Sequence, residues 1–265
     1  MGDDKSMAET SIGKEELKKI LRELKSESDV VKLEQKARYA LKQIDPKTLS
    51  IAEQELLEEG FSQEDLRKLC DVHLQLLGEN LEKGPSSDEG HPISILTEEH
   101  KIIKRSLDTL EHVTQNILTA KDYGEIQSEL VNLRESSELL LETESHHKRE
   151  EEALFPALEK HGISGPPRIM RMEHDELRAR KKALGDLVER HHGMEFDEFK
   201  AKLKETSDFI VAKLRDHIFK EDNILYPTST KTLGDEEWEE VRRSFDAIGY
   251  CCFTPRRKDR GLVSE

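Results

Sequence analysis

A histidine and a glutamate occur together twice in this sequence at the same spacing. In the segment His146–Pro156, a glutamate follows the histidine by four residues and a Leu-Phe-Pro tripeptide begins four residues later. The segment His217–Pro227 repeats this pattern, with tyrosine in place of phenylalanine. Residues four apart lie on one face of a helix, so each segment directs one imidazole and one carboxylate to the same side. Such mixed ligands suit iron or manganese better than a structural zinc site, which prefers thiolates.

A further histidine precedes each of these segments. Glu99-His100 lies 46 residues before His146, and Glu173-His174 lies 43 residues before His217. The same order in both halves predicts a duplicated helical hairpin, in which two carboxylates and four imidazoles converge on a centre able to hold two ions. The predicted metal ligands are His100, His146, Glu150, His174, His217 and Glu221.

The helix predicted over 126–158, which contains His146, has two possible registers. The apolar spacing that begins at Ile126 continues onto His147 and Glu151, whereas the repeat selects His146 and Glu150. We favour the repeat, because it fixes both the ligand spacing and the Leu-aromatic-Pro segment that follows. A one-residue bulge would reconcile the two readings, and such bulges gather at functional sites. His147 and Glu151 remain alternative ligands.

Four long helices must position these residues. Apolar residues recur at alternating steps of three and four over 93–117, and similar stripes run through 126–158, 170–188 and 196–225. This periodicity, with short connections, predicts an up-down four-helix bundle that a shorter helix over 236–248 closes at one end. Histidine and glutamate buried beside such stripes cost free energy unless they have partners. A metal centre or mutual salt bridges would supply them.

The bundle is expected to follow a small helical domain. Residues 1–13 are predicted to be a flexible N-terminus, 14–83 a small helical domain, 84–91 a polar, glycine-containing linker, 92–250 the bundle and 251–265 a polar tail. The linker begins with Gly84-Pro-Ser-Ser, directly after Lys83, and shows no apolar periodicity. Cys70 and His73 are too few to predict a second metal site. The predicted fold class is all-α.

Composition narrows the class of function. The chain has 265 residues, of which 37% are charged and 34% hydrophobic, and a net charge of −15. This charge repels phosphate backbones and anionic lipid, so we expect neither a nucleic-acid nor a membrane partner. An acidic start, the lack of long apolar runs and three cysteines (Cys70, Cys251 and Cys252) favour a cytoplasmic protein with reduced thiols.

These motifs resemble two known families. Glu99-His100, His146–Pro156, Glu173–Leu177 and His217–Pro227 resemble the hemerythrin HHE cation-binding family. Ile51–Gly60 and Lys68–His73 resemble family 438 of the domains of unknown function, often fused ahead of such bundles. The first resemblance implies a non-haem di-iron centre that binds oxygen or nitric oxide, with roles in oxygen carriage, sensing or iron–sulfur repair.

One departure from the family concerns a fifth histidine. Members that carry oxygen usually have one four residues after the third-helix histidine, but Arg178 occupies that position here. The fifth ligand is therefore unassigned, and His91 is a candidate. An incomplete set would leave coordination positions open, which favours chemistry over carriage.

The sequence is compatible with three functions. The first, which we favour, is a binding protein whose iron centre takes up oxygen or nitric oxide in sensing or storage. In this case the N-terminal domain reports or modulates occupancy, and the sequence does not identify its protein partner. The second is an enzyme that uses the same centre to reduce peroxide or nitric oxide or to assist iron–sulfur repair. The third is a metal-independent helical interaction protein, in which buried polar residues only fix the register.

Overall fold

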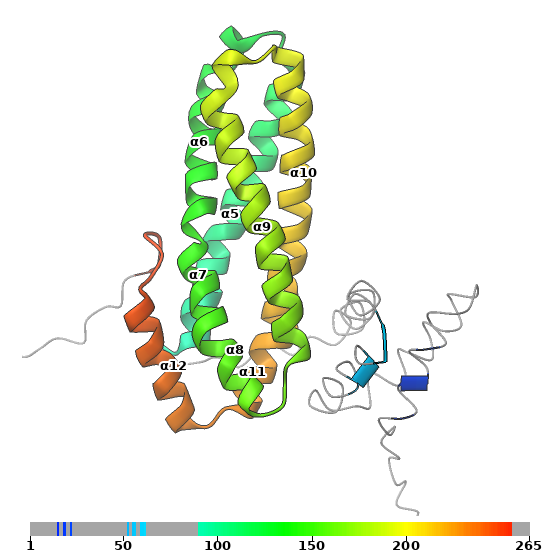
Figure 1. The fold of residues 1–265 in the computed structure, drawn as a ribbon. Helices are drawn as coiled ribbons and strands as arrows, with labels where there is room; N and C mark the ends of the chain where they lie inside the picture. The colour runs from blue at the N-terminus through cyan, green and yellow to red at the C-terminus, as the bar shows by residue number, and fades with distance from the viewer. Residues whose placement is uncertain are drawn as a thin grey trace, which may run out of the picture. The chain divides into compact units, whose positions relative to one another are not determined.

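A computed structural model describes residues 90–255 of the chain continuously (Figure 1). Before them it describes Glu15, Lys18, Lys19, Arg22, Ala52, Glu55, Leu56 and residues 59–61. Among these, buried Lys18 lies 2.7 Å from Glu55 and 2.6 Å from Glu59. Most of the predicted domain 14–83, the pair Cys70 and His73, and the basic residues 256–260 lie outside the described residues.

Four helical rods form the body of the fold, and the predicted all-α up-down bundle is confirmed. The first rod is α5 (Pro92–Thr119), and the third is α9 (Gly165–Arg190). The second comprises α6 (Gln127–Glu142), α7 (Glu144–Arg149), η2 (Glu150–Leu154) and α8 (Phe155–Lys160). The fourth comprises α10 (Phe196–Lys220), η4 (Glu221–Leu225) and α11 (Tyr226–Thr232). Short 3-10 turns, η1 (Tyr123–Ile126) and η3 (His191–Gly193), lie in two of the connections.

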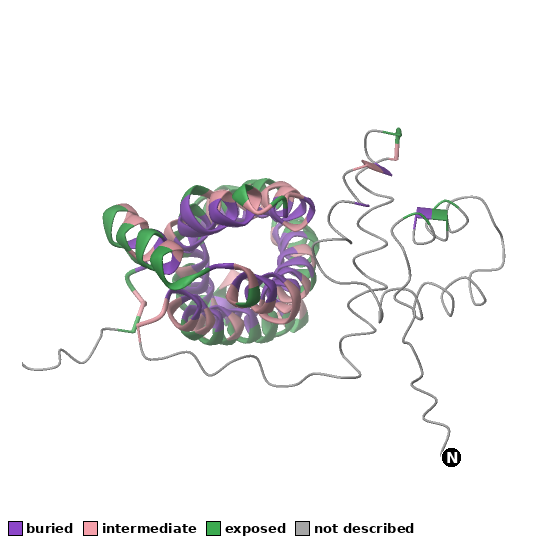
Figure 2. Cartoon of the chain, turned by 90° about the horizontal axis from the view of Figure 1, so that it is seen from below, coloured by how far each residue is buried: buried purple, intermediate pink, exposed green. Residues whose placement is uncertain are grey.

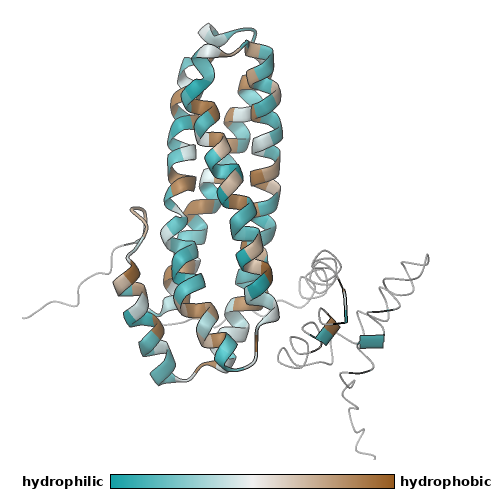
Figure 3. Cartoon of the chain, in the orientation of Figure 1, coloured by the Kyte–Doolittle hydropathy of each residue, from teal (hydrophilic) through white to brown (hydrophobic). Residues whose placement is uncertain are grey.

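The core lies along the axis that the rods enclose. Seen end-on, buried residues face inward from each rod and exposed residues face outward (Figure 2). Hydrophilic residues make up much of the ribbon of each rod (Figure 3). Fully buried leucines come from all four rods, as Leu107, Leu133, Leu184 and Leu203. Burying one such side chain stabilises the fold by about 1.5–3 kcal/mol. This apolar core therefore holds the four rods, and the predicted metal ligands on them, in place. Among the described helices, none is long and apolar enough to span a membrane.

Two of the rods contain a π-helical turn. In η2 the amide of Phe155 donates to the carbonyl of Glu150, and in η4 the amide of Tyr226 donates to the carbonyl of Glu221. Each bond spans five residues, so each turn holds one more residue than an α-helix would. The bulge suggested for the second helix is confirmed, whereas the one in the fourth helix was not predicted. Both turns begin at a predicted ligand.

A last helix, α12 (Asp235–Ile248), packs against α5, α7 and η2, as the sequence predicted for a helix closing one end. Gly249 follows it with a φ of 96°, a conformation that suits glycine, and turns the chain back toward the bundle. Cys251 is buried there, and the hydroxyl of Thr254 donates to Glu99. This turn thus brings Cys251 and Thr254, at the start of the predicted polar tail 251–265, against the bundle.

Candidate metal centre

All six predicted ligands are buried and come from the four rods. Their exposed fractions are 1% or less, in the order His100 1%, His146 1%, Glu150 0%, His174 0%, His217 1% and Glu221 0%. His100 and His174 lie on the first and third rods, and each remaining histidine lies one turn before a glutamate at the start of a π-helical turn. The structure therefore brings together the residues that the repeat selects.

The imidazoles meet in pairs through their Nε2 atoms. The Nε2 atoms of His100 and His146 are 3.2 Å apart, and those of His174 and His217 are 2.9 Å apart. Glu221 spans the pairs, because its Oε2 lies 3.1 Å from Nε2 of His100 and its Oε1 lies 2.8 Å from Nε2 of His217. The cluster thus has two ends with a carboxylate between them.

Glu150 also lies between the two ends. Its Oε2 is 3.5 Å from Nε2 of His146 and 3.5 Å from Nε2 of His174. With Glu221 on the same cluster, two carboxylates face both pairs of imidazoles. This is the arrangement expected of groups that bridge two cations.

A fifth histidine joins the cluster. His147 is 2% exposed, and its ring stacks on that of His174 with centroids 4.0 Å apart. Among the described residues, His147, His174 and His217 offer donor atoms within 4.8 Å of one another, as do His100, His146 and Glu221. We call the first three residues the three-histidine end, and His100 with His146 the two-histidine end. From the sequence, His147 was an alternative to His146, whereas the structure places both in the cluster.

In each half of the repeat, a carboxylate of that half holds the outer nitrogen, Nδ1, of one histidine. Nδ1 of His146 lies 2.7 Å from Oε2 of Glu99, and Nδ1 of His217 lies 2.9 Å from Oε2 of Glu173. A carboxylate can only accept, so each Nδ1 carries the proton and donates. This tautomer leaves the lone pair of Nε2 facing the cluster, as metal ligation by histidine requires.

The other two histidines are held across the halves. Nδ1 of His100 lies 2.7 Å from Asp222, and Nδ1 of His174 lies 2.7 Å from Glu151. Each of these acids directly follows a glutamate of the cluster. The backbone of a π-helical turn therefore positions one acid toward the cluster and the next toward the back of a histidine from the other half.

A basic side chain contacts each of the four outer carboxylates. Glu99 receives Arg149, Glu173 receives Lys213 and Lys220, Glu151 receives Arg178, and Asp222 receives Lys104, at distances from 2.7 to 3.0 Å. Such pairing offsets the cost of burying the acids. It also keeps them ionised: burial alone would raise the pKa of Glu99, but His146 and Arg149 lower it to about 2.

Burial and neighbouring charges shift the pKa values of the inner groups in different directions. Burial lowers the pKa of His146 to about 4 and that of His147 well below its ordinary value. Burial alone would also lower the pKa of His217, but the charge of Glu221 raises it to about 9. Burial raises the pKa of Glu150 well above its usual range, and the neighbouring charge of Glu221 adds to this effect.

The hydrogen bonding of these residues fits a bound cation. Oε2 of Glu150 and both carboxylate oxygens of Glu221 are buried without a hydrogen bond. Buried polar atoms are normally paired, and leaving a carboxylate oxygen unpaired is costly. When the imidazoles are neutral and carry their protons on Nδ1, the lone pairs of their Nε2 atoms also face one another at 2.9 and 3.2 Å. A pair of cations would satisfy both sets of atoms.

Comparison with known proteins agrees with this geometry. Residues 91–229, more than half of the chain, match the hemerythrin HHE cation binding domain. The chain belongs to the hemerythrin HHE family. Residues 17–83 match a family of unknown function, DUF438, and both resemblances stated from the sequence are confirmed. No match was found among the curated proteins.

The remaining alternatives from the sequence lie outside the cluster of this HHE protein. Glu151 bonds the back of His174 and receives Arg178, so it is a support of a candidate ligand. His91 caps α5, where its Nδ1 accepts from the amide of Ile93, and its ring contacts Trp238. His91 is therefore not among the residues that the structure groups in this cluster. Its position directly before Pro92 makes it the cap of a helix.

The supporting role of the outer residues was not predicted from the sequence, although the repeat contains a signal for it. Glu99-His100-x3-Lys104 corresponds to Glu173-His174-x3-Arg178, and the residues that support the cluster match as well. In the second and fourth rods, His146-x2-Arg149-Glu150-Glu151 corresponds to His217-x2-Lys220-Glu221-Asp222. Arg178 thus stands where a further histidine was expected because it is the counterpart of Lys104, and both bind an acid of the other half.

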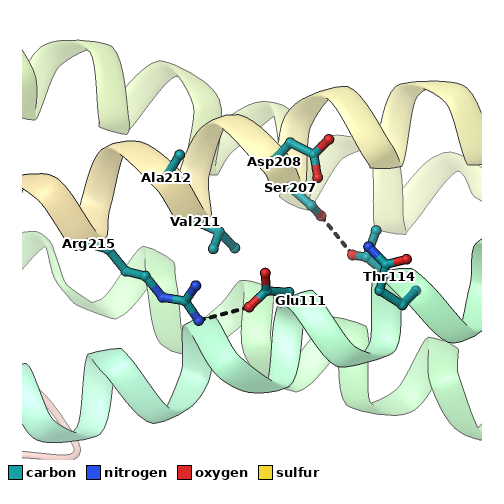
Figure 4. A pocket seen from close by; sticks show the side chains of 8 residues that line it. Glu111, Thr114, Ser207, Asp208, Val211, Ala212 and Arg215 are labelled. Carbon is teal, nitrogen blue, oxygen red and sulfur yellow. Dashed lines mark hydrogen bonds and ion pairs between the residues drawn. The ribbon is translucent and has the colours of Figure 1, made fainter.

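A pocket of about 280 Å³ lies elsewhere in the bundle, between α5 and α10 (Figure 4). Its lining residues are Glu111, Thr114, Gln115, Ser207, Asp208, Val211, Ala212 and Arg215, none of which belongs to the histidine cluster. Thr114 and Ser207 bond at 2.9 Å, and Arg215 contacts Glu111 at 2.9 Å. These two contacts join polar side chains of α5 to polar side chains of α10.

Proposed function

We propose that this protein binds a non-haem di-iron centre that reversibly takes up oxygen or nitric oxide, in sensing or storage. The observation that carries the proposal is the inward convergence of five imidazoles and two carboxylates, among them three buried carboxylate oxygens without hydrogen bonds. Such a set of donors would leave a large unfavourable free energy in the folded protein unless cations occupied it.

The two ends would each hold one ion. At the three-histidine end the donors are His147, His174 and His217, and at the two-histidine end they are His100 and His146. Glu150 and Glu221 lie between the ends and supply the shared oxygens. The two-histidine end has one imidazole fewer, so it has more room for an external ligand.

The ligand types favour iron, with manganese as the alternative. Imidazole suits iron, copper, nickel and zinc, whereas carboxylates suit the harder ions, so a mixed set points between these classes. Iron would supply a redox-active centre with affinity for diatomic molecules. The protein's own residues fix the protons: Glu99, Glu151, Glu173 and Asp222 keep each Nδ1 protonated and each Nε2 free to bind.

The enzyme alternative rested on an incomplete histidine set. His147 lies in the cluster, so the set is not short of a fifth imidazole, and that argument for turnover is weaker. The metal-independent alternative would leave the unpaired oxygens of Glu150 and Glu221 without compensation. Binding of a small molecule by a metal centre is therefore the function that the geometry supports best.

Metal analysis and absorption spectroscopy test the proposal. The full-length protein, purified from iron-replete cells, should contain close to two irons per chain and show charge-transfer bands that change reversibly between air, nitrogen and nitric oxide. Colourless protein without metal would refute the proposal. Steady consumption of peroxide or nitric oxide, abolished by His217→Ala, would decide for an enzyme instead.

A further inference from the structure

A turn that follows α12, residues 249–254, lies outside the repeat and outside the residues 91–229 that match the family. Three of its side chains contact the bundle. Cys251 is 4% exposed, Phe253 packs against the hydrophobic core, and the hydroxyl of Thr254 donates to Oε1 of Glu99. The amide of Thr254 also donates to the carbonyl of Cys251 at 3.0 Å, which closes the turn. Apolar and polar contacts therefore dock this C-terminal turn on the bundle.

The carboxylate that this turn contacts has a counterpart in the second half, which two lysines support. Glu173 receives Lys213 at 2.7 Å and Lys220 at 3.0 Å, both from the fourth rod. The other oxygen of Glu173 accepts from Nδ1 of His217. Two ammonium groups thus hold the carboxylate that supports this histidine.

The first half lacks one of these two donors. When the two His-x3-Glu segments are aligned, Arg149 corresponds to Lys220, and it contacts Glu99. The other lysine corresponds to Glu142, an exposed acid that cannot donate a hydrogen bond when it is ionised. The Thr254 hydroxyl, which reaches Glu99 from outside the repeat, supplies the second donor instead.

The same part of the chain also covers the cation that pairs with Glu99. The guanidinium carbon of Arg149 lies 5.0 Å from the ring centroid of Tyr250 and 5.4 Å from that of Phe245, and its Nη2 donates to Sγ of Cys251 at 3.6 Å. Arg149 and Glu99 are both fully buried. Exclusion of water strengthens such a charge pair, so the docked turn stabilises the support of the two-histidine end.

We propose that Thr254 is a positioning residue for the ion at the two-histidine end, which holds His146 through Glu99 and couples the docking of the C-terminal turn to metal binding. The inference rests on the proposed function and adds a control of the same site. One oxygen of Glu99 accepts from Nδ1 of His146 at 2.7 Å, and Thr254 holds the other oxygen. Coupling of this kind is reciprocal, so the bound ion should also hold the turn in place.

Iron binding by the full-length protein, measured in competition with a chelator, tests the proposal. Thr254→Val removes the hydroxyl and keeps the shape of the side chain, whereas Thr254→Ser keeps a hydroxyl and is the matched control. We expect Thr254→Val to bind one of its two irons about tenfold more weakly, at the lower end of the effect of losing a group that supports a ligand. Thr254→Ser should bind both irons as the original protein does.

Thiol labelling measures the reverse effect, that of the ion on the turn. In a Cys252→Ser background, mass spectrometry of the digested protein distinguishes labelling at Cys251 from labelling at Cys70. We expect Cys251 to react about tenfold faster after a chelator removes the iron, because the coupling acts equally in both directions. In Thr254→Val, removal of iron should change this rate much less.

Three results would overturn the inference and leave the proposed function standing. The first is equal iron affinity in Thr254→Val and the original protein, each with two irons. The second is an equal loss of affinity in Thr254→Ser, because the hydroxyl would then not be the cause. The third is a rate of Cys251 labelling that does not depend on iron. An original protein that binds no iron would instead refute the proposed function itself.

Discussion

The ring of His147 stacks on the ring of His174, with centroids 4.0 Å apart and planes inclined by 9°. The two residues come from the second and third rods, and His147 lies beside His146, which belongs to the other end of the cluster. Adjacent residues on a helix point about 100° apart. The adjacent residues His146 and His147 therefore contribute to different ends of the cluster.

Replacing His147 should weaken one ion more than the other. His147→Ala removes one of three imidazoles from the three-histidine end and none from the two-histidine end. We expect iron content to fall from about two toward one per chain, measured by metal analysis after equilibration against limiting iron. His112→Ala is the control, since His112 is exposed on α5. Two tightly bound irons in His147→Ala would exclude a ligand role for His147.

The outer carboxylates should affect metal affinity without touching the metal. Glu99→Gln and Glu173→Gln each weaken the hydrogen bond that fixes a histidine proton. We expect each substitution to lower metal affinity by roughly 10–100-fold, the usual effect of losing such a support. Competition with a coloured chelator measures it. Glu98→Gln, at an exposed neighbour of Glu99, is the control; a loss no greater than that of the control would contradict the proposed support.

Metal removal should destabilise the fold. Binding to the native state alone at a hundred times the dissociation constant adds about 2.7 kcal/mol. For a protein of this size that corresponds to a decrease in Tm of about 5–10 °C on chelation. Differential scanning calorimetry with and without chelator measures the change, and His217→Ala should show little response. An unchanged Tm in the original protein would favour the metal-independent interpretation.

Arg149 and Glu99 should be strongly coupled in stability. The guanidinium is fully buried and contacts both oxygens of Glu99, at 2.8 and 2.7 Å. Arg149→Met leaves that carboxylate without its cation, which should cost about 3–5 kcal/mol of unfolding free energy in urea. The double variant with Glu99→Gln should lose less than the sum of the single losses. Additive losses would argue against the pair.

An exposed ion pair provides the comparison. Arg215 lies on the surface, where it contacts Asp108 and Glu111 at 2.7 and 2.9 Å. Arg215→Met should cost about 1 kcal/mol or less, because solvent screens exposed pairs. A loss as large as that of Arg149→Met would mean that burial does not set the difference.

The repeat predicted much of the fold and the inner ligands because both depend on local spacing. Histidine and glutamate four residues apart share a helix face whatever the rest of the chain does. The apolar stripes likewise predicted four rods and a closing helix. The DUF438 region was recognised from short motifs, and the match over 17–83 confirms the family.

The fifth histidine could not be assigned from spacing alone. An added residue in a helix rotates everything after it, so the π-helical turn at Glu150 lets both readings of the register hold in part. His146 and Glu150 follow the repeat, while Leu154 and Leu158 follow the apolar stripe into the core. His147 can be assigned to the cluster only when the position of His174, on another rod, is known.

The outer support of the cluster depends on contacts between distant parts of the chain. Asp222 bonds His100 across a separation of 122 residues, and Thr254 bonds Glu99 across 155. The repeat contained the Asp222 signal, whereas Thr254 reaches Glu99 only because the chain turns at Gly249. No repeated motif marks that contact.

A crystal structure of the iron-loaded, full-length protein, with anomalous data collected at the iron edge, would locate the bound ions. Two anomalous peaks are expected inside the bundle. One should lie within bonding distance of His147, His174 and His217, the other of His100 and His146, with Glu150 and Glu221 between them. A single peak, a peak outside this cluster, or no peak in protein crystallised with iron would contradict this expectation.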